Sequence, residues 1–205
     1  MTNAWKKQTV LFLASQTISL FGSSLVQYAI LWHITLETQS GAMMTLSIVC
    51  GFLPSFFISP FAGIWADRYD RKKLIVAADA LIASAALVIA LMFSRGYDVL
   101  WLLFLAMGIR SFGSGVQTPA VNAFLPQIVS ADQLMRVNGI NGSIQSLITL
   151  LSPVASGALM TLVTLDKIFL IDVATAAAAI VILIFFLRVP VHAGALQAEK
   201  TGYWQ

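Results

Sequence analysis

The sequence predicts an all-α membrane protein with six transmembrane helices, and two observations carry that prediction. Of 205 residues, 59% are hydrophobic and only 10% are charged, whereas soluble domains are about 45–50% apolar and about 25% charged. The apolar residues form long continuous runs, not the short alternating segments of a membrane barrel. Because backbone groups in lipid must be satisfied within the segment, these runs are expected to be helices.

Six runs come near the length of about 20 residues that a helix needs to cross the hydrocarbon core. The expected spans are residues 9–34, 43–65, 74–94, 99–122, 138–163 and 168–188. The first run is too long for a signal-peptide core, so we expect an uncleaved span. The longest internal loop is expected at residues 126–136. Residues 1–188 should form one transmembrane domain, and residues 189–205 the start of a cytoplasmic linker at which the chain is truncated.

The distribution of basic residues predicts that both termini are cytoplasmic in an inner-membrane protein. An even number of spans brings both ends to one side, and cytoplasmic loops are rich in Lys and Arg. With that orientation, two basic residues, Arg95 and Lys167, lie outside. Nine lie inside: Lys6, Lys7, Arg68, Arg71, Lys72, Lys73, Arg136, Arg188 and Lys200. The small net charge of +3 therefore reflects topology, and no nucleic-acid partner is expected.

A faint internal repeat relates the first three spans to the last three. Two Ser-Pro pairs each stand with the proline 19 residues before an aspartate, and the two sets are 93 residues apart. The pairs are Pro60 with Asp79 and Pro153 with Asp172, and at the same offset Gly22 falls on Gly115. Because three is an odd number, the second triplet would run in the opposite direction. Inverted repeats of this kind build many transporters.

The most charged stretch, Gly63–Lys73 (GIWADRYDRKK), lies between the second and third apolar runs and is expected to be a hinge in water. It resembles the G-x-L-A-D-R-x-G-R-K loop of major facilitator superfamily transporters. The matching residues are Gly63, Ala66, Asp67, Arg68, Arg71 and Lys72. Two positions differ, because Ile64–Trp65 replaces x-Leu and Asp70 replaces the second glycine.

Two longer stretches, residues 51–83 and 118–147, look like the macrolide-efflux type of this superfamily. The resemblance implies one half of a major facilitator fold, with six helices arranged as a 3+3 inverted repeat in the lipid bilayer. It also implies a carboxy-terminal half, either missing from this chain or supplied by a second chain. The implied activity is proton-coupled efflux of small apolar drugs such as macrolides, by rocking of the two halves.

The resemblance implies a gating motif made of Gly63, Asp67, Arg68, Arg71 and Lys72, in which the aspartate docks against the opposite half. Asp67 is expected at a helix C-terminus, where the helix dipole disfavours a carboxylate. We therefore expect it to pair with a cation or with the amino end of another helix; Arg71 is the nearer cation and Arg68 the second. The alternative is simple anchoring of basic residues at lipid headgroups, which suits Lys72.

Arg110 is the costliest residue, because an arginine at the centre of a span costs about 2.5–3.5 kcal/mol on insertion scales. In the family, an arginine here belongs to an R-x-x-x-G pattern linked with proton coupling, and here Gly113 and Gly115 bracket the expected glycine. Asp79, about 9 Å inside the third span, is the expected partner. The alternative is an ion pair that serves packing alone.

Asp79 and Asp172 are the acids well inside the expected spans, and together with Arg110 they are the proton-coupling candidates. Burial favours the neutral form of a carboxyl group, so either could carry a proton. Asp172 lies only five residues after Lys167, so a polar cap at the outer interface is the alternative for it.

Four amides are candidates for the substrate cavity, because the first and fourth helices line it in this family. They are Gln16, Gln27, Gln117 and Asn122. Such groups can orient a largely apolar ligand, but they can equally join helices through hydrogen bonds. In the fifth span, SPVASG resembles the antiporter motif G-P-x-x-G-G and keeps Pro153 and Gly157. We expect this motif to permit close helix packing.

No enzyme, cofactor or metal site is expected. His33 and His192 would lie on opposite membrane faces, Cys50 is the single cysteine, and no histidine lies at the depth of Ser114 to activate it. No HExxH, phosphate-binding loop or CxxC motif occurs. The alternative to a transporter is a non-transporting membrane scaffold or a regulatory half-transporter.

Overall fold

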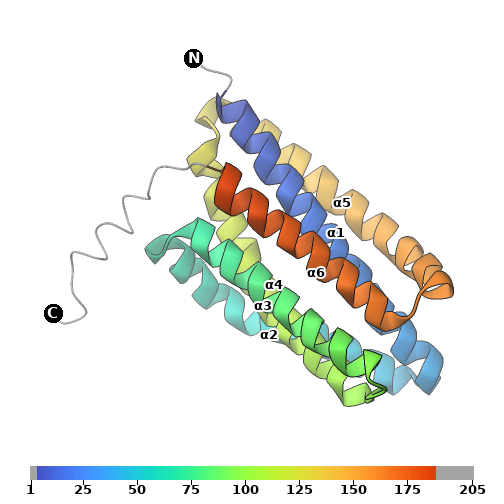
Figure 1. Cartoon of the computed structure of the whole chain (residues 1–205). Coiled ribbons are helices and arrows are strands. Elements are labelled where there is room, and N and C mark those ends of the chain that lie inside the picture. The colour runs from blue at the N-terminus through green and yellow to red at the C-terminus, as the bar shows by residue number, and fades with distance from the viewer. Residues whose placement is uncertain (1–3, 188–205) are drawn as a thin grey trace.

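The structure, a computed structural model, describes residues 4–187 and forms a bundle of six long helices (Figure 1). The helices are α1 Ala4–Thr38, α2 Gly41–Arg68, α3 Arg71–Ser94, α4 Leu100–Ile128, α5 Ala131–Leu162 and α6 Leu165–Val181, which continues as a short π-helix, η1 Ile182–Phe186. The all-helical architecture expected from composition is confirmed. The linker expected at residues 189–205, with His192, lies outside the described residues.

Five of these helices are long and apolar enough to cross a membrane, namely α1, α2, α3, α5 and α6 with η1. The exception in the described part of the chain is α4, which has 29 residues and lies in the same bundle (Figure 1). Polar residues such as Arg110 and Gln117 lower its apolarity, yet both are buried inside the bundle. Because α4 presents these groups to protein, it does not need an apolar surface all round.

The expected loop at residues 126–136 was wrong for most of its length. Helix α4 continues through Pro126 to Ile128, and α5 begins at Ala131. Proline at this position removes one backbone donor from the helix, and α4 nevertheless continues for two residues beyond it. The break falls at Val129 and Ser130, whose backbones are extended.

Helix packing has the exchange symmetry that the inverted repeat predicts. Helix α4 packs against α2 and α3, while α1 packs against α5 and α6, and α3 packs against α6. Exchanging α1 with α4, α2 with α5 and α3 with α6 converts the first set of pairs into the second. The faint sequence repeat therefore corresponds to a real relationship between the two triplets.

Glycines allow the closest helix contacts. A methyl group built on Gly22 would collide with Thr175, where α1 meets α6, and one built on Gly113 would lie 2.6 Å from Ile82 Cγ1, where α4 meets α3. The two helix pairs at these approaches exchange with one another when the triplets are exchanged, although the 93-residue offset places Gly22 on Gly115 and not on Gly113. Gly115 has the same function between α4 and α2, because its added Cβ would lie 2.8 Å from Ser55 Cα.

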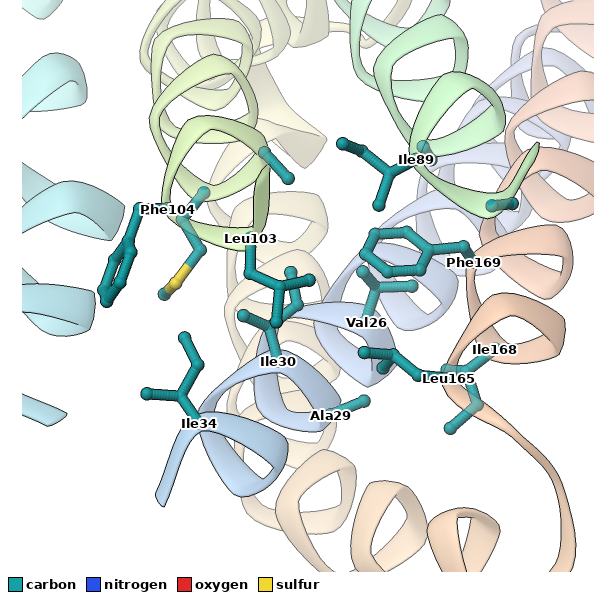
Figure 2. Packing of buried hydrophobic residues seen from close by; sticks show 14 residues of the cluster. Val26, Ala29, Ile30, Ile34, Ile89, Leu103, Phe104, Leu165, Ile168 and Phe169 are labelled. Atoms are coloured by element: carbon teal, nitrogen blue, oxygen red, sulfur yellow. The ribbon is translucent and has the colours of Figure 1, made fainter. Parts of the chain in front are cut away.

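Two apolar clusters fill the interior between α1, α3, α4 and α6. One lies at the end of the bundle where α4 and α6 begin (Figure 2), and the other lies where they finish. The first includes Val26, Ile30, Ile89, Leu103 and Phe169, and the second includes Phe12, Ile75, Phe124, Leu125 and Leu183. On all four helices, polar residues separate the two clusters. A buried polar layer thus crosses the middle of the bundle.

Candidate functional site: a buried polar layer

The polar layer is built from one or two side chains of each of the four inner helices. Its members are Ser19 and Ser23 on α1, Asp79 on α3, Arg110 and Gln117 on α4, and Asp172 on α6. All are buried except Ser23, which is half-buried. The layer contains all three proton-coupling candidates of the sequence and one of the four amides.

Arg110 forms an ion pair with Asp172, and both side chains are buried, at 4% and 0% exposed. Arg110 Nη2 also donates to the backbone carbonyl of Ser23 at 2.7 Å, and Ser23 Oγ donates to Asp172 Oδ1 at 2.9 Å. One cluster of hydrogen bonds therefore joins α1, α4 and α6. The interfacial cap considered for Asp172 was wrong, because its carboxylate is fully enclosed by these partners.

The expected pairing of Arg110 with Asp79 was also wrong, and the direction of the helices explains the difference. Helices α4 and α6 begin at the same end, with Arg110 10 residues and Asp172 seven residues from their starts, or about 15 Å and 10 Å. Asp79 instead lies eight residues from the start of α3, which is at the opposite end. Measured from the same end of the bundle, Arg110 therefore lies at a depth closer to that of Asp172 than to that of Asp79.

Asp79 is a buried carboxyl group, 2% exposed, held by two hydrogen bonds. Ser19 Oγ and Gln117 Nε2 each donate to its Oδ1 at 2.8 Å, while Oδ2 has no hydrogen-bond partner among the described residues. The ion pairs within residues 4–187 are Arg110 with Asp172 and Arg71 with Asp67. Asp79 thus has no cationic partner in this part of the chain.

The four amides do not share one surface. Gln117 binds Asp79, Gln16 is buried, and Gln27 is half-buried beside Gly51, whose added Cβ would lie 2.8 Å from Gln27 Nε2. Asn122 is exposed on α4. A cavity of about 900 Å³ lies at the end of the bundle where α4 and α6 begin. It is lined by residues that include His33, Glu37, Asp98, Asp166 and Lys167, and by none of the four amides.

The hinge between α2 and α3 occupies only Tyr69 and Asp70. Asp70 caps α3, because its Oδ1 accepts from the backbone N–H of Lys72 at 2.9 Å and of Lys73 at 3.3 Å. This accounts for an aspartate where the family loop has a glycine, since Asp is a preferred N-cap residue. We call the end of the bundle that carries this loop the hinge end.

Arg71 bridges two helix ends. Its Nε donates to the carbonyl of Ala66 in α2 at 2.8 Å, and its Nη1 donates to the carbonyl of Ala123 in α4 at 2.9 Å. The expected pairing with Asp67 exists, at 3.7 Å from Nη2 to Oδ1, but the Asp67 side chain is 78% exposed. An exposed ion pair contributes little, so the carbonyl contacts are the stronger part of Arg71's role in the fold.

Lys72 does the same for α6. Its Nζ donates to the carbonyl of Leu187 at 2.8 Å and of Ile184 at 3.3 Å. Cations are favourable at helix C-termini, where the dipole is negative, so Arg71 and Lys72 together stabilise the ends of α2, α4 and α6. These contacts were not predicted from the sequence. In a bundle of alternating helices, however, α2, α4 and α6 all end on the same side, next to the loop that carries Arg71 and Lys72. Gly63 has open space beside it, with no described atom within 4 Å of an added Cβ.

The fifth-helix motif packs on α1. Trp32 Nε1 donates to the carbonyl of Pro153 at 3.3 Å, and an added Cβ on Gly157 would lie 3.7 Å from that nitrogen. Ser156 Oγ donates to the carbonyl of Leu25 at 2.9 Å. The small residues of SPVASG thus let α1 and α5 approach one another. Within residues 4–187, no group of three His, Cys, Asp or Glu side chains is arranged to hold a metal.

Comparison with known proteins identifies relatives that cross membranes. The model of the Major Facilitator Superfamily matches residues 12–204. Macrolide efflux protein A of Streptococcus pyogenes is 34% identical over 188 residues, which are 92% of this chain and 46% of that protein. Macrolide efflux protein A of Enterococcus faecalis is 36% identical over 151 residues, 73% of this chain and 46% of that protein. The lysophospholipid transporter LplT of Yersinia enterocolitica serotype O:8 is 27% identical over 150 residues, 72% of this chain and 34% of that protein. The chain thus spans about half the length of the macrolide efflux relatives.

Proposed function

This chain belongs to the Major Facilitator Superfamily, a family of transporters and not of enzymes, and we propose that it is the amino-terminal half of a proton-coupled drug exporter. The other half is either a carboxy-terminal continuation or a second chain. The proposed cargo is a largely apolar drug of the macrolide class, exported by antiport with protons. The single observation that carries the coupling is the buried Asp79, which has no cationic partner among residues 4–187.

The relatives support the choice of cargo. Two proteins named for macrolide efflux are 34% and 36% identical to this chain, over 92% and 73% of its length. Amides on α1 and α4 supply the polar contacts that an otherwise apolar ligand needs for orientation. Gln27 and Asn122, which are not engaged in the polar layer, are the amides best placed to meet such a ligand.

The surfaces of α2 and α5 support a second half. Helix α2 exposes Phe52, Phe56 and Phe57, which suit lipid or another apolar helix. Helix α5 exposes Asn138 and Gln145 within a candidate span. Polar side chains at that depth face protein or a water-filled cavity rather than lipid. A central cavity between two rocking halves provides such a water-filled environment.

The polar layer supports a division of labour between the two buried acids. The charges of Arg110 and Asp172 neutralise one another, so this pair can stay ionised and hold α4 to α6. Asp79 has hydrogen bonds but no cation in the described chain. An isolated buried carboxylate is so costly that such groups take up a proton. We therefore assign proton uptake to Asp79 and a structural function to the Arg110–Asp172 pair.

The hinge end supports a gate. The carboxylate of Asp67 is exposed and only loosely paired with Arg71, and Gly63 one turn earlier offers open space for a second helix. In our proposal the hinge end is cytoplasmic. Asp67 meets a helix of the other half there when the transporter closes towards the cytoplasm, while Arg68 remains exposed to solvent and Arg71 and Lys72 hold the loop in place.

The function is tested by drug accumulation in cells that express the complete transporter containing this chain. Export lowers the steady-state content of a labelled macrolide, and an uncoupler that dissipates the proton gradient restores it to the level of cells without the transporter. A scaffold or regulatory half-transporter would leave accumulation unchanged in both conditions. If the cells still contain little macrolide after the proton gradient is removed, the chain takes part in export but the export is not coupled to protons.

A further inference from the structure

One buried side chain next to the polar layer has no function in the account above. Gln16 on α1 is 1% exposed, and neither its Oε1 nor its Nε2 has a hydrogen-bond partner among the described residues. Buried polar atoms are nearly always paired with protein groups or with ordered water. A glutamine that merely filled space could be replaced by an apolar residue at no loss, so a partner outside the protein atoms is the simpler account.

The register of α1 places Gln16 close to Asp79. Gln16 precedes Ser19 by three residues, so the two side chains are neighbours on one face of the helix. Ser19 Oγ donates to Asp79 Oδ1 at 2.8 Å, and the other oxygen of that carboxyl group, Oδ2, also has no partner among the described residues. Three unpaired polar atoms, two of the amide and one of the carboxyl, therefore flank a single hydrogen bond.

We propose that Gln16 is a positioning residue of the Asp79 proton site and binds one water molecule between its amide and Asp79 Oδ2. This inference rests on the proton function proposed for Asp79. In the structure neither amide atom of Gln16 bonds Asp79 Oδ2, and a water molecule between them can donate to Oδ2 while it accepts from Nε2 or donates to Oε1 of the amide. A hydronium ion arriving there gives its proton to Oδ2, forming an O–H bond, and leaves a neutral water held by Gln16.

The charged groups near this site are paired with one another, which leaves hydrogen bonds to influence the proton affinity of Asp79. From the packed helices, Arg110 on α4 and Asp172 on α6 face the layer, and they are paired with one another. Helix α1 contributes only the uncharged Gln16, Ser19 and Ser23 to this region. Arg110 compensates the charge of Asp172, so the water and amide next to Asp79 have a measurable influence on its proton affinity.

The test uses the complete transporter in proteoliposomes and follows drug-driven proton movement as a function of pH. Gln16→Leu removes the water-binding amide at similar volume and leaves a more apolar site, which favours the neutral carboxyl. The pH of half-maximal coupling should rise by about half to one unit, the size expected for one net hydrogen bond. The matched control is Thr17→Val, because Thr17 Oγ1 bonds only the carbonyl of Leu13 in its own helix. This control should leave the midpoint unchanged.

An unchanged midpoint in Gln16→Leu, with transport retained, would overturn the inference. If that variant does not fold, Gln16→Met replaces it, and the infrared C=O band of the protonated carboxyl, identified by its loss in Asp79→Asn, is measured instead. A shift of the band to higher frequency supports a lost hydrogen bond, and an unmoved band contradicts it. If Asp79→Asn itself keeps the wild-type pH profile, the assignment of the proton to Asp79 has failed, independently of Gln16.

Discussion

Arg110 on α4 is ion-paired with Asp172 on α6 in the interior of the bundle, and a second contact ties Arg110 to the backbone of Ser23 on α1. The pair lies between two apolar clusters, so its charges are shielded from both ends of the bundle. This arrangement separates a neutralised pair from a second buried acid, Asp79, which has hydrogen bonds alone in the described chain. The separation underlies the function proposed above.

Breaking the pair should cost far more than removing it. Arg110→Met or Asp172→Leu alone leaves an uncompensated buried charge and should lower the free energy of unfolding by about 3–5 kcal/mol. The double variant removes both charges and should regain most of that loss. Thermal unfolding of the purified complete transporter in detergent measures all three. Additive losses in the double variant would show that the two residues do not act as a pair.

The closest helix contact makes a second prediction. Gly22→Ala places a methyl group against Thr175 and should destabilise the protein by about 1–3 kcal/mol, as overpacking usually does. Thr175→Ala in the same molecule should restore most of the stability. Gly139→Ala is the control, since no described atom lies within 4 Å of its added Cβ. An equal effect of both glycine variants would contradict close packing as the cause.

Lys72 and Lys73 are adjacent lysines with different contacts. Lys72→Met removes two hydrogen bonds to the end of α6 and η1 and should lower the free energy of unfolding by about 0.5–1.5 kcal/mol. Lys73 uses its backbone N–H to reach Asp70 and keeps an exposed side chain, so Lys73→Met should stay within about 0.5 kcal/mol of the wild type. Comparable losses in both variants would mean that surface charge, and not the helix cap, is responsible.

The proposed orientation makes a prediction that can be tested by labelling. In a Cys50→Ser background, Arg68→Cys should react with a membrane-impermeant maleimide only in inside-out vesicles, and Arg95→Cys only in right-side-out cells. The reason is that the Lys and Arg excess of this chain gathers at the hinge end. Reaction of position 68 from the cell exterior would reverse the topology and remove the gate from the cytoplasmic side.

Composition and apolar run length were sufficient to predict a six-helix membrane fold, and the 93-residue offset anticipated the exchange symmetry of the packing. The partner of Arg110 was not predicted, because depth was counted without comparing the ends from which α3, α4 and α6 start. The continuation of α4 past Pro126 was missed, since one proline does not decide where a helix ends. The capping contacts of Arg71 and Lys72 join segments more than 50 residues apart, and no local pattern encodes them.

The most direct test of the account compares Asp79→Asn with the wild type in proteoliposomes of the complete transporter. Asparagine keeps the size of the side chain and an oxygen that can accept from Ser19 and Gln117, but it cannot take up a proton at Oδ2. With a proton gradient imposed, we predict that the variant still binds the macrolide, loses gradient-driven drug movement and no longer moves protons when drug is added. Proton movement coupled to drug in Asp79→Asn at the wild-type rate would contradict the central claim.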